Sequence, residues 1–168
     1  MKNTTQKIVI SSMFAALVCV ATMIIKIPSP LTGYLNLGDC IVLLAGWILS
    51  PVYGFLAAGI GSALADVFSG YVLYAPATFL IKGLMAVCAF YLFQFFNKRT
   101  KKIISRISSG FLAELLMVLG YYLFESCLYG IQAPLVNIPA NAVQGAAGLL
   151  MGIILIQIFE KNHIHFFD

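Results

Sequence analysis

Long apolar stretches with very few charges restrict the fold of this chain more than any other feature. The segment YVLYAPATFLIKGLMAVCAFYLF, residues 71–93, holds one charge, Lys82. Hydrophobic residues make up 61% of the chain and charged residues 10%, whereas soluble domains carry about 25% charged residues. Spanning segments in lipid must satisfy their own backbone hydrogen bonds, which favours helices here. We therefore expect an all-α integral membrane protein in which residues 1–168 form a single domain.

Chain-breaking residues divide the apolar sequence into six predicted transmembrane helices. Without the break at Ser50-Pro51, one run would extend over roughly 33 residues, too long for one ordinary span. The second helix is short against the typical length of about 20 residues, so we expect it to be tilted, half-buried or partly irregular. The first run has no cleavage site of the signal-peptide type and counts as a span. The predicted spans are 8–27, 37–49, 52–69, 76–96, 107–129 and 139–159.

The basic residues predict how the six helices are oriented. The linker NKRTKKIISR is their main cluster, and only Lys26 falls on the opposite side of the membrane. The positive-inside rule then places the basic side, with both termini, in the cytoplasm. A lipid-binding or nucleic-acid patch is the alternative for this linker; we favour the topology signal and expect no nucleic-acid partner. The basic residues on the predicted inner side are Lys2, Lys7, Lys98, Arg99, Lys101, Lys102, Arg106 and Lys161.

Polar side chains gather in the predicted outer half of the bundle, on five of its helices. The inner half has only Glu114 and the hydroxyls of Ser108 and Ser109. Polar groups are costly in hydrocarbon, and purely structural ones would be spread through the depth of the bundle. The asymmetry therefore indicates an outward-facing pocket for a polar solute. Its candidate residues are Asp39, Asp66, Lys82, Glu125, Asn141 and Gln144.

Lys82 has two compatible interpretations. A buried lysine needs a carboxylate partner, and Asp66 and Asp39 are both available for a structural ion pair. Direct contact with a ligand is the other interpretation. The same choice applies to the two aspartates, for which pairing or helix capping is slightly favoured. Ligand contact is favoured for Glu125, because no basic residue remains to pair with it.

Helical spacing groups several of these residues. Asn141 and Gln144 are three residues apart and share a helix face, as do Tyr121 and Glu125, which are four apart. Tyrosines near the predicted outer surface are explained either by a headgroup belt or by the pocket. The belt is the favoured interpretation for Tyr71 and Tyr129. For Tyr74 and Tyr121 the two interpretations are balanced.

Small residues form faces on three of the predicted helices. Those of 52–69 and 139–159 are best explained by packing within the bundle. The first helix carries SSMFAALVCVA, in which Ser12 and Ala16 are four residues apart, and this face suits docking of another membrane protein. The four cysteines form no CxxC pair and are interpreted as small buried hydrophobic residues rather than disulfides or metal ligands.

The chain resembles the substrate-binding S components of energy-coupling factor (ECF) vitamin transporters, in particular the riboflavin-type family. The segment SMFAA resembles the AxxxA docking motif of their first helix, with serine in place of the first alanine. The blocks YLNLGDCIVLLAGWILSPVYGFLAAGIGSALAD, SGYVLYAPATFLIKGLMA, GFLAELLMVLGYYLFE and NIPANAVQG resemble other parts of that family, in order.

This resemblance implies a division of labour. The S component captures a vitamin or its precursor outside the cell and then docks on a membrane coupling (T) subunit driven by two ATPase (A) subunits. The loop SPLTGYLNLGD would be a lid from which Tyr34 and Asn36 touch the substrate. The docking face for the T subunit would consist of Ser12, Ala15 and Ala16. The protein would lie in a bacterial plasma membrane. Small rings such as pyridoxine or hydroxymethylpyrimidine are favoured, and riboflavin is possible.

Two other classes of function compete with this interpretation. A self-contained proton- or ion-coupled transporter would use Asp39, Asp66, Glu114 and Glu125 as a relay, yet the inner half offers only Glu114. An intramembrane enzyme would need a catalytic constellation, and both histidines, His163 and His165, are in the C-terminal tail. The chain also has no GxxxxGK[ST] motif for ATP. We expect no catalytic residues, no metal site and no cofactor.

Overall fold

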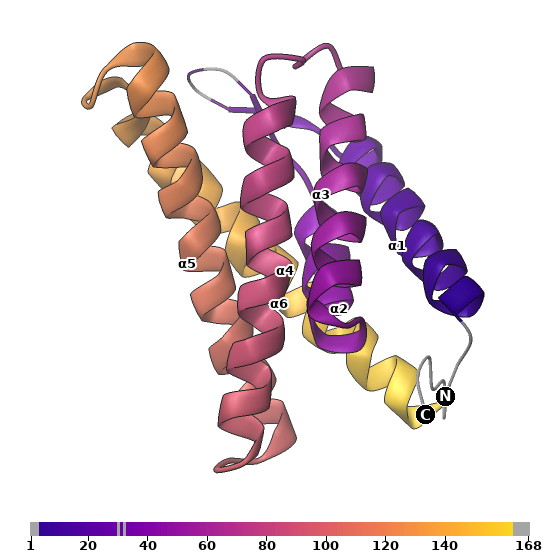
Figure 1. Cartoon of the computed structure of the whole chain (residues 1–168). Coiled ribbons are helices and arrows are strands. Elements are labelled where there is room, and N and C mark those ends of the chain that lie inside the picture. The colour runs from indigo at the N-terminus through magenta and orange to yellow at the C-terminus, as the bar shows by residue number, and fades with distance from the viewer. Residues whose placement is uncertain (1–3, 30, 32, 163–168) are drawn as a thin grey trace.

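The protein is a bundle of tilted helices, in which α1 begins and α6 ends at the same end of the molecule (Figure 1). The computed structural model describes residues 4–29, 31 and 33–162. The predicted all-α bundle of six membrane helices is confirmed. The elements in chain order are α1 (Thr4–Ile24), β1 (Ile27–Pro28), β2 (Tyr34–Leu35), α2 (Gly38–Ile48), α3 (Pro51–Phe68), α4 (Ala75–Asn97), α5 (Lys102–Tyr129), the 3-10 helix η1 (Ala133–Asn137) and α6 (Ile138–Lys161).

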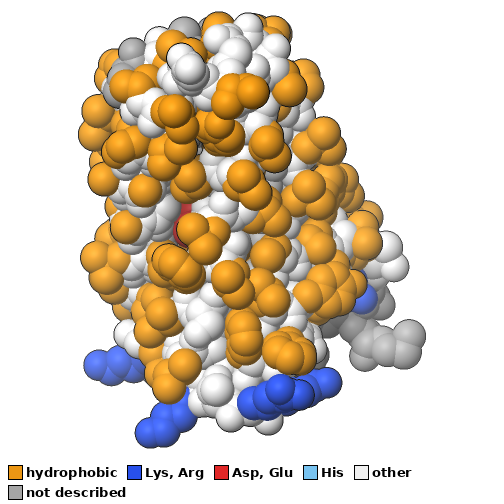
Figure 2. Space-filling view, turned by 90° about the vertical axis from the view of Figure 1, so that its left-hand side faces the viewer, with side chains coloured by type: hydrophobic (Ala, Val, Ile, Leu, Met, Phe, Trp, Pro, Cys, Tyr) orange, Lys and Arg blue, Asp and Glu red, His pale blue; other side chains and the backbone are white. Residues whose placement is uncertain are grey.

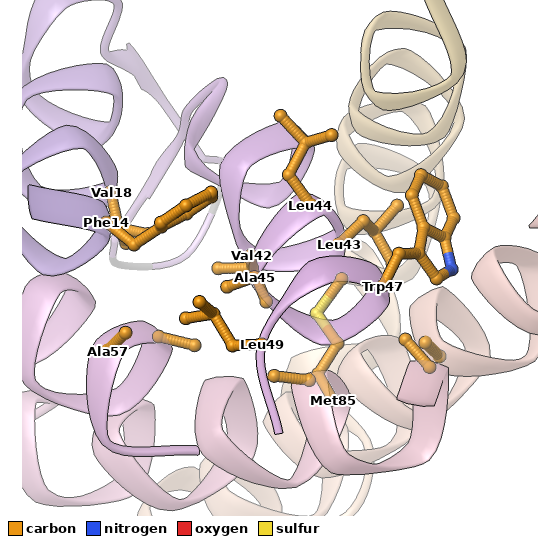
Figure 3. Close-up of a cluster of buried hydrophobic side chains, with 14 of the residues drawn as sticks. Phe14, Val18, Val42, Leu43, Leu44, Ala45, Trp47, Leu49, Ala57 and Met85 are labelled. Carbon is orange, nitrogen blue, oxygen red and sulfur yellow. The ribbon is translucent and has the colours of Figure 1, made fainter. Parts of the chain in front are cut away.

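The short helix α2 forms the centre of the bundle. It packs against α1, α3, α4 and α6, and nine of its eleven residues are buried. Its apolar side chains, including Leu43 and Leu44, meet those of α1 and α4 (Figure 3). Five other helices in the described part of the chain are long and apolar enough to cross a membrane, and α2 is not. Since lipid is as apolar as leucine, this centre is held mainly by van der Waals packing and hydrogen bonds.

The turn between α2 and α3 is set by Ser50-Pro51. Ser50 is extended, with φ −70° and ψ 159°, and Pro51 is the first residue of α3. Proline is favoured at this position because it has no backbone N–H to leave unpaired and its φ already suits a helix. The turn reverses the chain, so the apolar run of 37–69 folds back on itself as predicted.

Glycines let the helices approach closely around α2. A Cβ on Gly46 would lie 2.6 Å from the Ala86 carbonyl oxygen of α4. A Cβ on Gly61 of α3 would lie 2.4 Å from the Ala15 carbonyl oxygen of α1. Such contacts with backbone leave no room for a side chain. The small residues of α3 therefore pack within the bundle, as the sequence predicts.

The outer surface has the character of a lipid-facing protein. Large apolar side chains are exposed on every long helix, and Figure 2 shows them covering most of one face. On that face the lysine and arginine side chains gather at the lower end, where α4 ends and α5 begins (Figures 1 and 2). The basic side chains on this side thus lie at one end of the molecule, and the apolar band lies beyond them (Figure 2).

Several predicted boundaries differ from the structure. The first helix ends at Ile24 rather than at residue 27, because Ile27 and Pro28 form strand β1. The fifth helix begins at Lys102 rather than at residue 107, so part of the predicted linker is helical. Of the four cysteines only Cys40 is buried, whereas Cys19 and Cys88 are half-buried and Cys127 is exposed, which corrects the expectation that all four are buried.

Candidate functional site

A polar cavity lies at the end of the bundle opposite the basic linker, where α3 passes into α4 and where η1 leads into α6. Its volume is about 40 Å³, so its own side chains nearly fill it. Tyrosine, carboxyl and amide groups dominate its wall, and among the described residues neither lysine nor arginine lines it. The lining residues are Ser29, Gly33, Tyr34, Asn36, Asp66, Tyr71, Tyr74, Thr78, Tyr121, Glu125, Asn141 and Gln144.

The loop after α1 covers this cavity as a short antiparallel hairpin, with Ile27 opposite Leu35 and Pro28 opposite Tyr34. The hairpin turns through Gly33, whose φ of +104° favours glycine, and the Ser29 amide donates to the Gly33 carbonyl at 3.2 Å. Pro30 and Thr32, which belong to the predicted lid SPLTGYLNLGD, lie outside the described residues.

Hydrogen bonds fasten the hairpin, and Lys26 just before it, to α3 and its C-cap and to η1. The Tyr34 hydroxyl donates to Asp66 Oδ1 of α3 at 2.8 Å, and Lys26 Nζ donates to Ser69 Oγ at 2.6 Å. The Leu31 amide donates to the Asn137 side-chain oxygen at 3.1 Å. Burial and the neighbouring Asp66 carboxyl raise the pKa of the Tyr34 hydroxyl, so this group remains a donor at neutral pH. The loop is therefore held down across the mouth of the cavity.

The segment between the hairpin and α2 is irregular, and its backbone polar groups need partners. The Asn36 amide donates to Gln144 Oε1 of α6 at 3.0 Å, and the Asn36 side chain accepts the Gly38 amide at 2.9 Å. Irregular backbone at membrane depth is tolerated where protein satisfies it. A Cβ on Gly38 would lie 2.0 Å from Thr22 Oγ1, so glycine is required for α2 to begin against α1.

Asp39 and Lys82 form a buried ion pair between α2 and α4. Gln144 Nε2 donates to the second oxygen of Asp39 at 2.7 Å, which joins the pair to the cavity wall. The Lys82 ammonium also lies 5.5 Å from the centre of the Tyr121 ring. Of the two carboxylates expected as partners for Lys82, the structure selects Asp39.

Glu125 has only neutral hydrogen-bond partners in the part of the chain that the structure describes. The Asn137 side-chain amide lies 3.0 Å from each of its carboxyl oxygens, and the Tyr74 hydroxyl donates to Oε1 at 3.4 Å. Asn137 is 2% exposed and ends the 3-10 helix η1. The sequence correctly indicated that Glu125 has no basic partner, and α5 and η1 are joined through it instead.

Three tyrosine rings that line the cavity contact one another. The ring centres of Tyr34 and Tyr71 are 4.9 Å apart, and those of Tyr71 and Tyr74 are 6.4 Å apart. Phe124, which does not line the cavity, supports Tyr74 at 5.3 Å between ring centres. The Tyr121 hydroxyl, also at the cavity, donates to Thr78 Oγ1 at 3.1 Å. Aromatic side chains at these spacings suit a ligand that has a flat, partly apolar ring.

The structure brings eight of the ten predicted substrate-binding residues to this one cavity. Asp39 and Lys82 do not line it; they lie behind Gln144 as an ion pair. The eight are Tyr34, Asn36, Asp66, Tyr74, Tyr121, Glu125, Asn141 and Gln144.

Sequence reasoning missed several residues of the site. Thr78 lies four residues from both Tyr74 and Lys82, so helical spacing places it on their face. Asn137 precedes the Ile-Pro start of α6, a position typical of a polar cap. Tyr71, for which a headgroup belt was favoured, lines the cavity. Ser29 and Gly33 belong to the hairpin turn, whose geometry no sequence spacing indicated.

Glu114 is a second buried carboxyl group near the ion pair. It is 5% exposed, and neither of its oxygens has a hydrogen-bond partner among the described residues. A Cβ added to Gly148 would lie 3.1 Å from Glu114 Oε1 and 2.7 Å from Asp39 Cβ, which places the two acidic side chains close together. Glu114 lines an apolar groove between α5 and α6, on a face where acidic atoms are visible in a recess (Figure 2).

A larger groove of about 590 Å³ lies between α1 and α3, and its lining is almost wholly apolar. Ser12, Ala15 and Ala16 all line it. Ser12 and Ala16 are exposed, whereas Ala15 is half-buried and its carbonyl lies against Gly61. The face that the sequence singled out for docking is thus open to a partner at two of its three residues.

Comparison with known proteins places this architecture in a class. A solved structure described as the S component of a bacterial ECF transporter matches with a TM-score of 0.72 and 26% identity, over 95% of this chain and 98% of that one. The structure of an S component for biotin from an ECF-type ABC transporter matches with a TM-score of 0.66 and 17% identity, over 95% of each chain. The fold is that of an S component, a multi-pass membrane protein.

The family follows from the sequence itself. The model of the ECF-type riboflavin transporter S component matches residues 2–161, and the chain belongs to this family. It is therefore a substrate-binding component of a vitamin-uptake system that works with T and A subunits, and it is not a member of a catalytic family. An uncharacterised protein of Pyrococcus woesei is 36% identical over 146 residues, which are 86% of this chain and 95% of that protein.

Proposed function

We propose that this protein captures a small B-vitamin or vitamin precursor outside the cell and hands it to an ECF coupling module. Pyridoxine and hydroxymethylpyrimidine are the favoured substrates, and riboflavin is possible. The observation that carries the proposal is the convergence of eight predicted polar and aromatic side chains on one cavity. They come from the hairpin and the segment after it, from α3, from the turn that leads into α4, and from α5 and α6, so the site depends on most of the bundle.

The lid must open for a ligand to enter. Sites for drug-sized ligands measure about 300–1,000 Å³, and the cavity of about 40 Å³, partly covered by the hairpin, is much smaller. The hairpin is fastened by side-chain hydrogen bonds rather than by a packed core, and it has only two residues in each strand. Lifting it exchanges those few bonds for contacts with water and ligand. A small ring requires less opening than riboflavin, which supports the favoured substrates.

The partner would dock along the groove between α1 and α3. Ser12 and Ala16 keep this face shallow, so a helix of the T subunit can approach the backbone closely. We propose that two A subunits supply ATP hydrolysis to the complex. The basic end of the molecule would face the cytoplasm, with both termini there, because eight of ten basic residues lie on that side of the sequence-based topology. We propose a bacterial plasma membrane as the location, in line with the similarity to the S component of a bacterial ECF transporter.

Glu125→Ala and Asn141→Ala test the pocket assignment. Each removes a lining group, and each should weaken vitamin binding at least about tenfold, the effect of one lost hydrogen bond to a charged or buried group. Calorimetric titration of the purified protein measures the effect, with thermal unfolding to verify the fold. Gln157→Ala is a control, because it removes an exposed amide from the far end of α6. Wild-type affinity in both lining variants would overturn the assignment.

A further inference from the structure

The cavity has an acidic character that the sequence alone did not indicate. Asp66 and Glu125 line it, and no lysine or arginine does. The buried lysine of this region, Lys82, is paired with Asp39 and does not line the cavity. Lys26 lies outside the cavity and is bound to Ser69. A ligand therefore meets two carboxyl groups and a set of neutral side chains.

The two carboxyl groups differ in how far the protein satisfies them. Both oxygens of Glu125 accept hydrogen bonds from Asn137. Asp66 is 6% exposed, and its Oδ1 accepts the Tyr34 hydroxyl. Its Oδ2 is buried and has no hydrogen-bond partner among the described residues. Buried carboxyl oxygens are normally paired, so Asp66 Oδ2 is the acceptor that a bound donor would satisfy.

The surroundings of Asp66 suit a flat ring that carries this donor. Tyr34 holds the other oxygen of Asp66, and its own ring lies 4.9 Å from that of Tyr71. Thr78 lies beside the same carboxyl group. An aromatic face next to a carboxylate favours a planar ring with an amino group or a protonated nitrogen, because both the stacking and the charge are then matched.

We infer that Asp66 selects the substrate, and that the cavity takes six-membered nitrogen heterocycles with an amino group or a protonated ring nitrogen. Asp66 Oδ2 accepts a hydrogen bond from that nitrogen. Ligands with a carboxylate are rejected, because they would bring a negative charge between Asp66 and Glu125 with no lysine or arginine in the wall to receive it. This inference rests on the proposed function and narrows its substrate class.

Two matched pairs of ligands test the inference by calorimetric titration. Aminopyrimidine, in the form of 4-amino-5-hydroxymethyl-2-methylpyrimidine, is compared with the analogue that carries hydrogen in place of the amino group, and pyridoxine is compared with 4-pyridoxic acid. Wild-type protein should bind the first member of at least one pair about 10- to 100-fold more tightly than the second, the ratio expected for one hydrogen bond to a charged group. Equal binding within both pairs, or preference for the carboxylate, would overturn the inference.

Asp66→Asn then assigns the selection to one residue. The amide keeps the shape of the side chain but offers one acceptor and no negative charge, so the ratio within the aminopyrimidine pair should fall close to one. Glu125→Gln is the matched control for that pair, whose members carry no carboxylate, and there the ratio should persist even if both affinities drop. An unchanged ratio in Asp66→Asn would overturn the role of Asp66.

The outcomes separate this inference from the proposed function. If wild-type protein binds a vitamin but without the expected preference, the inference fails and vitamin capture stands. If it binds no B-vitamin or precursor at all, the proposed function fails and the inference falls with it. The wild-type ratios decide the substrate class even if Asp66→Asn does not fold.

Discussion

At the scale of single residues, the buried charges of this protein have unequal partners. Lys82 has Asp39, and Asp39 in turn holds Gln144. Glu114 has no partner among the described residues, although it lies near Asp39. Two acidic side chains, Asp39 and Glu114, thus lie close together, and the Lys82 ammonium pairs with Asp39. Because Gln144 donates to Asp39, we propose that this ion pair holds Gln144 in place in the cavity wall.

Breaking the pair from one side should destabilise the protein. Lys82→Met leaves Asp39 buried and uncompensated, and Asp39→Asn does the same to Lys82; each should cost about 3–5 kcal/mol. The double variant removes both charges and should recover most of that loss. Thermal or denaturant unfolding in detergent measures all three. Single variants as stable as wild type would contradict the importance of this pair.

Glu114→Gln separates capture from ion coupling. The amide keeps the size of the side chain but has no charge, so the fold and vitamin affinity should be unchanged within about twofold. Vitamin uptake by the assembled transporter should also persist, since its energy would come from ATP. Uptake in cells and calorimetric binding measure the two effects. Loss of uptake with binding intact would support the rival ion-coupled carrier.

At the scale of elements, the helices follow from the sequence because apolar length and breakers determine them. Pro51 separates α2 from α3, and the predicted short second helix is real. Its central position was not predictable, because an apolar segment of eleven residues has the same composition in lipid as in a core. The hairpin was also missed, since it depends on Gly33 and on contacts with α3 and α6.

The site was partly predictable because its residues lie on helices whose positions follow from the sequence. Helical spacing and depth place Asp66, Glu125 and Gln144 at one end of the bundle, and that end holds the cavity. Spacing does not show which carboxylate a lysine reaches. Only the packing of α2 against α4 assigns Asp39 to Lys82, and this removes the single cation from the wall.

Ala16→Trp tests the docking face of α1. Ala16 is exposed on the groove, so a large ring fills that groove without entering the bundle core. Vitamin binding by the isolated protein should be unchanged, and uptake should be lost because a T-subunit helix can no longer approach. Met13→Trp is the matched control, since Met13 is 57% exposed on the same helix but does not line this groove. Uptake that survives in Ala16→Trp would show that docking occurs elsewhere.

At the scale of the whole molecule, the two ends of the bundle differ in chemistry. The cavity and its hairpin lie at one end, and the basic linker between α4 and α5 lies at the other. At that second end, Arg106 of α5 donates to both carboxyl oxygens of Glu160 of α6, and Lys102 pairs with the same carboxylate. One end of the molecule thus has a polar cavity under the hairpin, and at the other end ion pairs join α5 to α6. This arrangement suits a protein that captures a solute and depends on a partner for its release.

The central claim is capture of a small vitamin by this protein alone, and one measurement tests it most directly. The purified protein is denatured, the released small molecules are identified by mass spectrometry, and candidate vitamins are titrated calorimetrically without ATP or an ion gradient. We predict that one B-vitamin or precursor is released and binds tightly under these conditions. The absence of any released vitamin, together with no heat of binding from any candidate, would contradict the account.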